Sequence, residues 1–453
     1  MAQETDKKII NASPTKDFFI SMIVRDIELV DAVADLVDNC VDGARRLRPN
    51  GSYKKLYAAL EVSNLEFRIE DNCGGITADV ARNYAFRFGR PKDFPTLEHS
   101  IGQFGIGMKR AFFKIGLQFT VESTSPISHF TMTVNVSDWR REPEWEFKFD
   151  ELIEGEEFLK RSKEFAHPET LVSITDLYPG VAAEFSLENF ITRLKEKLAV
   201  KHQDSLNKGL QITVNRDPLK SAPATLLRSK LLKPIVENFK LPGKINVRLY
   251  AGLSESDPNK AGWYVFCNGR LILEADQTER TGWGETKVTG ETSNQRKKTR
   301  IPYYHNQFAR FRGYVFFDAN NAAVLPWTTT KTDVDLNSPA FQATRQRMVL
   351  AMRPIIDFLN DLDGERSSEK RSKPLTKAVT SSREGQLATL KISKVFVAPK
   401  ASPLTISGPT LQRISYQRPT AEISLVRKTL KVRKLQEVGE RTFEYYLRAE
   451  CTK

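Results

Sequence analysis

The chain has 453 residues, of which 40% are hydrophobic and 28% charged, the composition of an ordinary core-forming protein. It contains no run of about 18 apolar residues, so no membrane-spanning helix is expected. The opening segment MAQETDKKIINASP has no apolar stretch of the signal-peptide kind. The scattered cysteines Cys40, Cys73, Cys267 and Cys451 favour a reducing compartment over disulfides or structural zinc. We expect a cytoplasmic protein, or a nuclear one if the organism is a eukaryote.

The net charge of +13 is concentrated towards the C-terminus. Residues 365–453 contain 19 Lys and Arg, 8 Glu and no Asp, an excess of +11 that leaves +2 for residues 1–364. The clusters RSSEKRSK (366–373) and VRKTLKVRK (426–434) could neutralise phosphates, or could be a solvated linker and a solvated helix face. We therefore expect nucleic acid as a partner of this region. The short apolar stripe in ERTFEYYLRAE (440–450) is a possible docking surface for a partner protein.

The first predicted element is a helix over residues 27–47, whose apolar residues recur at helical spacing. Alternation in LEFRIED predicts a strand over residues 65–71, and a second helix is expected to begin near Gly107. Further strands are predicted at residues 118–123, 130–136, 145–149 and 171–177. This pattern predicts an α+β unit in which helices are mixed with a largely antiparallel sheet.

A helix over residues 184–200 opens a second predicted α/β unit. Its strands are predicted at residues 245–253, 262–272 and 311–319, its closing helix at 341–362, and a polar loop at 276–300. The predicted organisation is a first domain at 1–180, a second domain at 185–364, a basic linker at 365–385 and a small accessory module at 386–453. The module is expected to contain short extended segments and a final helix near 426–450.

The segment ADLVDNCVDGA places Asp35, Asp38 and Asp42 at helical spacing with Asn39 among them. Asp is a poor helix former, and like charges three or four residues apart repel by roughly a few tenths of a kcal/mol. No Lys or Arg lies within this segment to neutralise them. A Mg²⁺ ion would explain the stripe, because it takes one or two protein oxygen ligands and completes its shell with water and phosphates. A solvated helix face is the plain alternative.

Two glycine-containing turns follow. IEDNCGGI brings Asp71 to the end of a strand, and the Gly-Gly pair permits a tight turn or close approach to a ligand; an ordinary turn is the alternative. In GQFGIGMKR, the glycines Gly102, Gly105 and Gly107 open a helix, whose N-terminal N–H groups can cradle phosphate. The spacing is neither a Walker sequence nor GxGxxG, so a P-loop or dinucleotide-binding fold is not indicated.

Four motifs follow one another in an order that resembles the GHKL ATPases. They are the acidic helix with its Asn, the strand ending in Asp-x-x-Gly-Gly, the GxxGxG turn and a strand led by Thr170. That superfamily includes gyrase B subunits, the large heat-shock chaperones, MutL, the MORC proteins and histidine kinases. IGQFGIGMKRAFFKIG looks closest to the MORC branch, and GWYVFCNGRLI is similar to a strand-turn-strand of the MORC second domain. No histidine precedes the Asn39 helix, which argues against a kinase. The resemblance implies a GHKL α/β sandwich, a mixed and mainly antiparallel sheet with helices on one face, followed by a transducer-like α/β domain.

The resemblance also implies roles for individual residues. Asn39 would bind the Mg²⁺ that gathers the phosphates of ATP, and Asp35 would be the general base. Asp71 would accept the adenine amino group and share a water with Thr170. Lys331, in LPWTTTKTDVD, matches the second-domain lysine that reaches the γ-phosphate. The other nucleotide-binding positions would be Gly75, Ile76, Gly102, Gln103, Phe104, Gly105, Ile106, Gly107, Met108 and Lys109.

The implied function is that of an ATP-hydrolysing clamp, a homodimer that closes when ATP binds and acts on DNA or nucleoprotein. The sequence departs from the superfamily pattern in three places. The base is usually Glu, and Asp35 is shorter by one methylene, about 1.5 Å, so hydrolysis is expected to be slow. Cys73 replaces a turn glycine, and Glu169 stands where Gly is common. A chaperone-like protein remodeller and a non-hydrolysing ATP-gated switch are the alternatives.

Overall fold

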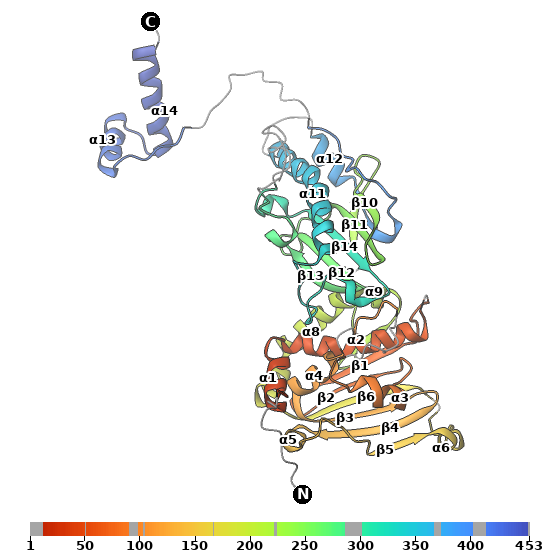
Figure 1. The fold of residues 1–453 in the computed structure, drawn as a ribbon. Coiled ribbons are helices and arrows are strands. Elements are labelled where there is room, and N and C mark those ends of the chain that lie inside the picture. The colour runs from red at the N-terminus through yellow and green to blue at the C-terminus, as the bar shows by residue number, and fades with distance from the viewer. Residues whose placement is uncertain are drawn as a thin grey trace. The chain divides into compact units, whose positions relative to one another are not determined.

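The computed structural model describes residues 12–49, 51–89, 98–102, 105–165, 167–221, 224–285, 301–366, 373–401 and 414–451. The chain divides into two compact units, residues 1–401 and residues 402–453 (Figure 1). The first unit contains both of the predicted α/β domains. None of the helices in the described ranges is long and apolar enough to cross a membrane.

The first domain is built on an eight-stranded sheet with the order β5-β4-β3-β6-β2-β1-β7-β8. Its strands are β1 (Tyr57–Val62), β2 (Phe67–Asp71), β3 (Gly116–Thr124), β4 (Ser128–Asn135), β5 (Glu151–Glu154), β6 (Glu169–Leu177), β7 (Gln211–Val214) and β8 (Asp217–Pro218). All neighbouring strands are antiparallel except β1 and β7, which are parallel. The predicted α+β class, with a mixed and mainly antiparallel sheet, is confirmed.

The main helices of this domain are α1 (Lys16–Arg25), α2 (Leu29–Leu47), α4 (Gly107–Ile115) and α8 (Glu188–Lys201). Shorter helices are α3 (Ala78–Val80), α5 (Val136–Arg141), α6 (Gly155–Lys160), α7 (Pro179–Phe185) and α9 (Gln203–Asn207). Helices α1, α2 and α4 lie on the same face of the sheet (Figure 1). Helix α2 is buried on its acidic side as well as on its apolar side, because α4 and α8 pack against it.

The structure differs from the sequence prediction at two places in this domain. Residues 145–149 form no strand; Trp145 and Phe147 pack instead against Phe88, with ring centroids 5.5 and 6.0 Å away. The domain also extends beyond the boundary predicted at residue 180, because β7 completes the first sheet beside β1. Local alternation cannot reveal a strand whose parallel partner lies far away in the sequence.

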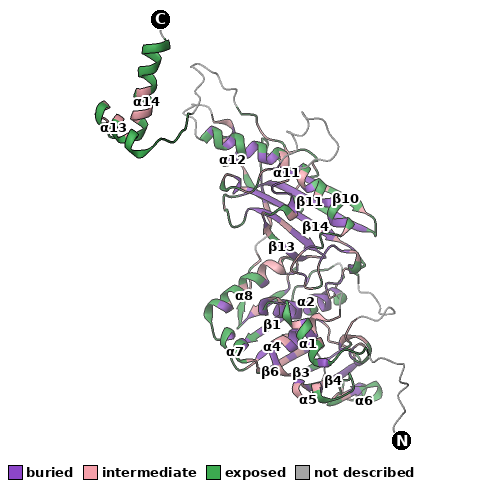
Figure 2. Cartoon of the chain, turned by 60° about the vertical axis from the view of Figure 1, so that its left-hand side comes forward, coloured by how far each residue is buried: buried purple, intermediate pink, exposed green. Residues whose placement is uncertain are grey.

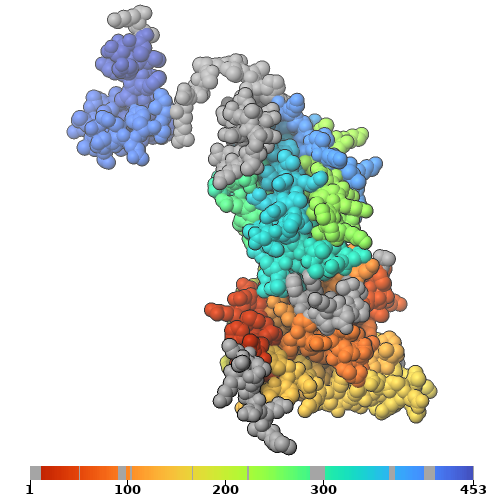
Figure 3. Space-filling view, in the orientation of Figure 1, coloured from red at the N-terminus to blue at the C-terminus, as the bar shows by residue number. Residues whose placement is uncertain are grey.

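The second domain contains a five-stranded sheet with the order β10-β11-β14-β12-β13. Its strands are β10 (Ile235–Leu241), β11 (Ile245–Leu253), β12 (Gly262–Cys267), β13 (Arg270–Asp276) and β14 (Phe311–Asp318), with a separate pair β9 (Thr225–Arg228) and β15 (Arg383–Gln386). The long helix α11 (Pro339–Arg366) packs on β11 and β14. Buried residues lie along the strands of both sheets (Figure 2). The two domains contact each other on the face shown in Figure 3.

The tail also differs from the prediction. Residues 373–401, expected to be a linker and the start of a module, belong to the first unit: α12 (Pro374–Thr380) packs on α11 and β15 pairs with β9. Leu375 and Leu387 are buried there, which explains why this largely polar segment packs on the second domain. In the second unit, two helices, α13 (Thr420–Leu430) and α14 (Leu435–Tyr446), replace the single helix predicted. Lys431 ends α13 in the left-handed conformation, with φ 51°.

Candidate functional site

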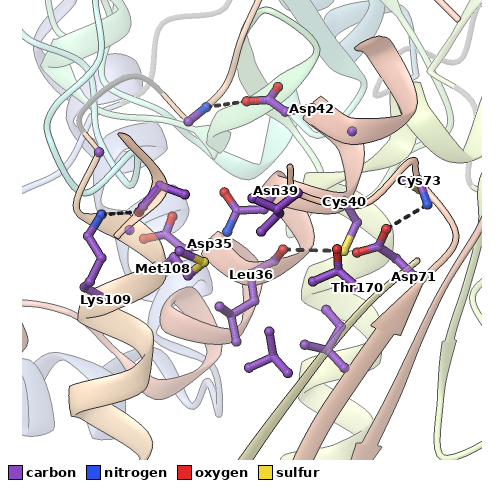
Figure 4. Close-up of a pocket in the computed structure, with 18 of the residues that line it drawn as sticks. Asp35, Leu36, Asn39, Cys40, Asp42, Asp71, Cys73, Met108, Lys109 and Thr170 are labelled. Carbon is purple, nitrogen blue, oxygen red and sulfur yellow. Dashed lines mark hydrogen bonds between the residues drawn. The ribbon is translucent and has the colours of Figure 1, made fainter. Parts of the chain in front are cut away.

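A cavity lies between α2, the end of β2, the start of α4 and a loop of the second domain (Figure 4). The volume of the cavity, including the space at its opening to solvent, is about 1250 Å³. The predicted site residues that line it are Asp35, Asn39, Asp71, Gly75, Ile76, Gly102, Gly105, Gly107, Met108, Lys109, Thr170 and Lys331. Ile106 precedes α4 without lining the cavity. Gln103 and Phe104, the other two predicted residues, lie outside the described residues.

One end of the cavity carries a buried carboxylate beside a hydroxyl. Asp71 is the last residue of β2 and lies directly opposite Thr170 on β6. The Asp71 carboxylate accepts a hydrogen bond from the Cys73 N–H at 2.7 Å, and Thr170 Oγ1 lies 3.0 Å from Ser123 Oγ. Burial raises the pKa of Asp71, and the hydrogen bonds that it accepts oppose that rise. This end can therefore recognise a flat polar ligand such as a base through a small number of directed hydrogen bonds.

The turn after β2 requires glycine at one position. Gly75 has φ 68°, and a Cβ there would lie 1.9 Å from the carbonyl oxygen of Thr124. The next residue, Ile76, donates its N–H to Ser123 Oγ at 2.8 Å. Cys73, which replaces a glycine of the superfamily pattern, is buried at the cavity wall, and burial raises its pKa. The thiol is therefore protonated and inert, and the substitution leaves the tight turn intact.

The other end of the cavity is formed by the glycine-rich turn and the first residues of α4. Gly102 donates its N–H to Asp42 Oδ2 at 2.8 Å, so Asp42 fixes the turn from α2. Gly107 begins α4 against Asp35, and a Cβ there would lie 3.1 Å from the Asp35 carboxylate. Because the first N–H groups of a helix have no partner within it, they are available to an anion. Lys109 is buried nearby and donates to the Ala85 carbonyl at 2.8 Å.

The acidic stripe of α2 is neutralised by cations from distant parts of the chain. Lys331 Nζ lies 3.1 Å from Asp35 Oδ1 and 2.7 Å from Asp38 Oδ2. Arg110, on α4, pairs with Asp35 Oδ2 at 2.5 Å. Arg270, on β13, lies 3.5 Å from Asp38 Oδ1. The prediction that a Mg²⁺ ion explains the stripe is therefore corrected in part, because basic residues of α4 and the second domain supply much of the compensating charge.

We call this group the charge cluster; its members are Asp35, Asp38, Arg110, His202, Arg270 and Lys331. All six side chains are buried. His202 Nε2 lies 3.0 Å from Asp38 Oδ1 and 3.1 Å from Arg270 Nη1. The sequence prediction missed Asp38, Arg110, His202 and Arg270 as site residues, because only the tertiary structure brings them together. Two of the four had a local signal in the sequence: Asp38 lies on the acidic stripe, and Arg110 follows Lys109 after the glycine turn.

The pKa shifts within the cluster follow from burial and charge. Burial lowers the pKa of Lys331, but the carboxylates of Asp35 and Asp38 outweigh it, so the net shift is upward. Burial alone would raise the pKa of Asp38, whereas Arg270 and Lys331 hold it well below its usual range. Burial lowers the pKa of His202, against the opposing effect of Asp38. The lysine is therefore charged, the aspartate ionised and the histidine neutral near pH 7.

Asn39 is the exception on the stripe. Its side chain is exposed at the cavity wall and makes no hydrogen bond with any other described residue, whereas the neighbouring carboxylates are all paired. An amide oxygen that is free in this position fits a Mg²⁺ that takes its other ligands from phosphates and water. No group of three or more His, Cys, Asp or Glu side chains in the described ranges could hold a metal ion. Asn39 is thus the residue of the stripe that fits this role.

Residues 27–165 match the family model described as histidine kinase-, DNA gyrase B-, and HSP90-like ATPase. These residues provide most of the cavity wall, including α2, β2 and α4. This segment is a GHKL-type ATPase domain, a class that binds ATP. The match identifies the superfamily and not the MORC branch within it. No curated protein matches the chain.

Proposed function

We propose that this protein is a Mg²⁺-dependent ATPase whose second domain senses the γ-phosphate through Lys331. The observation that carries this proposal is the position of Lys331 on the cavity wall, 3.1 Å from Asp35. Lys331 comes from a loop of the second domain, whereas Asp35 comes from α2 of the ATPase domain. A ligand that draws the Lys331 ammonium towards itself would thus act on both domains at once.

The charge of the cluster supports an anionic ligand. Its two aspartates carry two negative charges and its two arginines and lysine carry three positive charges, with His202 neutral. The cluster therefore has one buried positive charge in excess. A net excess of buried charge is costly, and an anion at the cavity would reduce that cost. A triphosphate held at the start of α4 would supply the missing negative charge.

In the hydrolysis that we propose, a water oxygen bonds to the γ-phosphorus as the bond to the ADP oxygen breaks, and Asp35 takes the proton of the water. Mg²⁺ held with Asn39 would offset the negative charge of the phosphates. In the structure both oxygens of Asp35 are engaged, Oδ1 by Lys331 and Oδ2 by Arg110. Lys331 must therefore leave Oδ1 before that oxygen can take a proton.

The same contacts favour a second candidate, a switch that binds ATP without hydrolysing it. Asp35 is shorter than the usual glutamate, and both of its oxygens are held by cations. Binding alone can drive such a switch, because a ligand at about 100 times its dissociation constant stabilises the state that it binds by about 2.7 kcal/mol. The two candidates share the nucleotide site and differ in turnover.

We propose nucleic acid as the client, held by a clamp of two copies that closes when ATP binds. Support for nucleic acid comes from the charge excess of +11 in residues 365–453. Within the second unit, Arg427, Lys428, Lys431, Arg433 and Lys434 gather around the turn between α13 and α14, with no acidic residue among residues 427–434. Dimerisation rests on the resemblance to the clamp-forming GHKL proteins.

The experiment that tests the proposal is the ATPase rate of the full chain, measured with and without Mg²⁺ and with and without duplex DNA, over a series of salt concentrations. We expect Mg²⁺-dependent turnover that DNA stimulates at low salt and stimulates less as salt rises. ATP binding without turnover would favour the switch. Absence of ATP binding would refute both candidates, and turnover that is indifferent to DNA at every salt concentration would refute the proposed client.

A further inference from the structure

We propose that Asp38 is a positioning residue that holds Lys331 in the nucleotide-free protein and competes with the γ-phosphate for it. This inference rests on the proposed function of Lys331 and adds to it a restraint that sets how strongly ATP is preferred over ADP. Asp38 is one residue from Asn39 in the sequence, yet the two side chains lie in different surroundings: Asn39 is exposed at the cavity, and Asp38 is 0% exposed.

Asp38 does not line the cavity, whereas Lys331 does. Its two oxygens have different partners: Oδ2 lies 2.7 Å from Lys331 Nζ, and Oδ1 lies near His202 at 3.0 Å and Arg270 at 3.5 Å. Asp38 therefore joins the lysine of the cavity wall to two side chains that lie deeper in the protein. Of the two carboxylates that hold Lys331, Asp38 makes the shorter contact.

Lys331 is the cation that the cluster can release. When Lys331 leaves, Asp35 keeps Arg110 as a partner, and Asp38 keeps Arg270 and His202. The departure leaves two carboxylates with two arginines, so no buried carboxylate is left unpaired. Loss of either arginine would instead leave one carboxylate dependent on Lys331. The arrangement thus favours exchange of Lys331 between Asp38 and a ligand.

The contact between Asp38 and Lys331 lowers the affinity for ATP and not the affinity for ADP. ADP has no γ-phosphate to draw Lys331 away, so the contact with Asp38 persists and does not affect its affinity. ATP gains the lysine only in the fraction of molecules in which Asp38 has released it, and its apparent affinity is reduced by that fraction. Asp38 would therefore set the ATP-to-ADP preference without touching the nucleotide.

The test is the affinity of the full-length protein for ADP and for a non-hydrolysable ATP analogue, measured by calorimetry on Asp38→Asn. A hydrogen bond to a charged group contributes enough that we expect about a tenfold gain in affinity for the analogue, with ADP affinity unchanged. In a Lys331→Ala background, Asp38→Asn should change neither affinity, because the restraint acts through Lys331. Asp31→Asn is the matched control: Asp31 is on the same helix, pairs with Lys201 at 2.8 Å and does not line the cavity.

The double variant Asp38→Asn/Arg270→Gln covers the case in which Asp38→Asn fails to fold. It removes one charge of each sign, so the cluster keeps its net charge, and it should show the same gain for the analogue. Equal changes in both nucleotide affinities, no change at all, or a gain that persists without Lys331 would overturn the inference. If Lys331→Ala alone leaves affinity for the analogue unaltered, the proposed function of Lys331 has failed instead.

Discussion

Lys331 and Asp38 are 293 positions apart in the sequence, yet the Lys331 ammonium lies 2.7 Å from Asp38 Oδ2. This contact joins a loop of the second domain to α2 of the ATPase domain. The resemblance implies that Lys331 reaches the γ-phosphate. In the structure Lys331 contacts two carboxylates, so a γ-phosphate that bound Lys331 would have to replace them as its partner.

Asp35→Asn should keep nucleotide binding and lose turnover by about 10²–10⁴-fold, the usual contribution of a general base. The variant also leaves Arg110 and Lys331 without the charge of Asp35, so its unfolding midpoint should fall. Steady-state ATPase rates, with binding measured in parallel, test the role. Asp35→Glu is the matched variant, since it restores the usual base of the superfamily. Wild-type turnover in Asp35→Asn would show that another group takes the proton.

Asn39→Ala should remove the Mg²⁺ dependence of ATP binding while leaving the fold unperturbed. Its side chain is exposed and makes no hydrogen bond with any other described residue, so deleting it removes no hydrogen bond among those residues. The measurement is a Mg²⁺ titration of nucleotide affinity, with the thermal unfolding midpoint recorded for both proteins. An unchanged Mg²⁺ dependence would mean that the ion, if bound, has its ligands elsewhere.

Lys331→Ala should leave ADP affinity nearly unchanged and weaken affinity for ATP, turnover and nucleotide-dependent dimerisation. Each carboxylate keeps a second partner, so the cost in stability should be smaller than that of Asp35→Asn. Lys331→Arg is expected to restore little of the ATP affinity and turnover, because a planar guanidinium does not replace a compact ammonium in a buried site. Equal losses for ADP and ATP would argue against γ-phosphate sensing. Sedimentation with each nucleotide gives the dimer fraction.

Removal of residues 402–453 should weaken DNA binding and flatten its salt dependence, because the segment contains 10 Lys and Arg against 5 Glu. The cut should be made after residue 401, where the first unit ends, since β15 and α12 pack on the second domain. The full chain with Gln at the five basic positions of residues 427–434 is a matched charge control. DNA affinity equal to that of the intact protein in both variants would place the nucleic-acid surface elsewhere.

Stability should fall as the pH drops below about 6.5, the pKa of an unperturbed histidine. His202 is buried between Asp38 and Arg270, and burial, with Arg270, lowers its pKa despite the opposing carboxylate. The unfolded chain therefore binds the proton at a higher pH than the folded protein does, so acidification favours unfolding. The pKa of Asp38 is held low, so its own contribution is lost only at much lower pH.

His202→Gln should flatten this part of the pH profile, measured as the thermal unfolding midpoint at pH values from about 7.5 to about 5, on either side of the ordinary histidine pKa. An identical slope in the variant and the original protein would show that His202 does not control acid stability.

Elements with a strong local signal were predictable. The apolar period of residues 27–47 gave α2, alternation before Asp71 gave β2, and the glycine turn before Gly107 gave α4. The WEFKF segment alternates equally well, but Trp145 and Phe147 pack against Phe88 without strand pairing. Periodicity reports which side chains are buried; it does not report what the backbone pairs with.

The resemblance of the sequence motifs to the GHKL pattern predicted which residues of the ATPase domain gather at one cavity, and a strand end, a helix start and a glycine turn place most of those residues locally. The tertiary structure decided how the acidic stripe of α2 is neutralised. Arg270 and Lys331 belong to the second domain, and nothing near them in the sequence marks them as partners of Asp35 and Asp38. Charges interact through space, so packing one domain on another makes pairs that no local pattern contains.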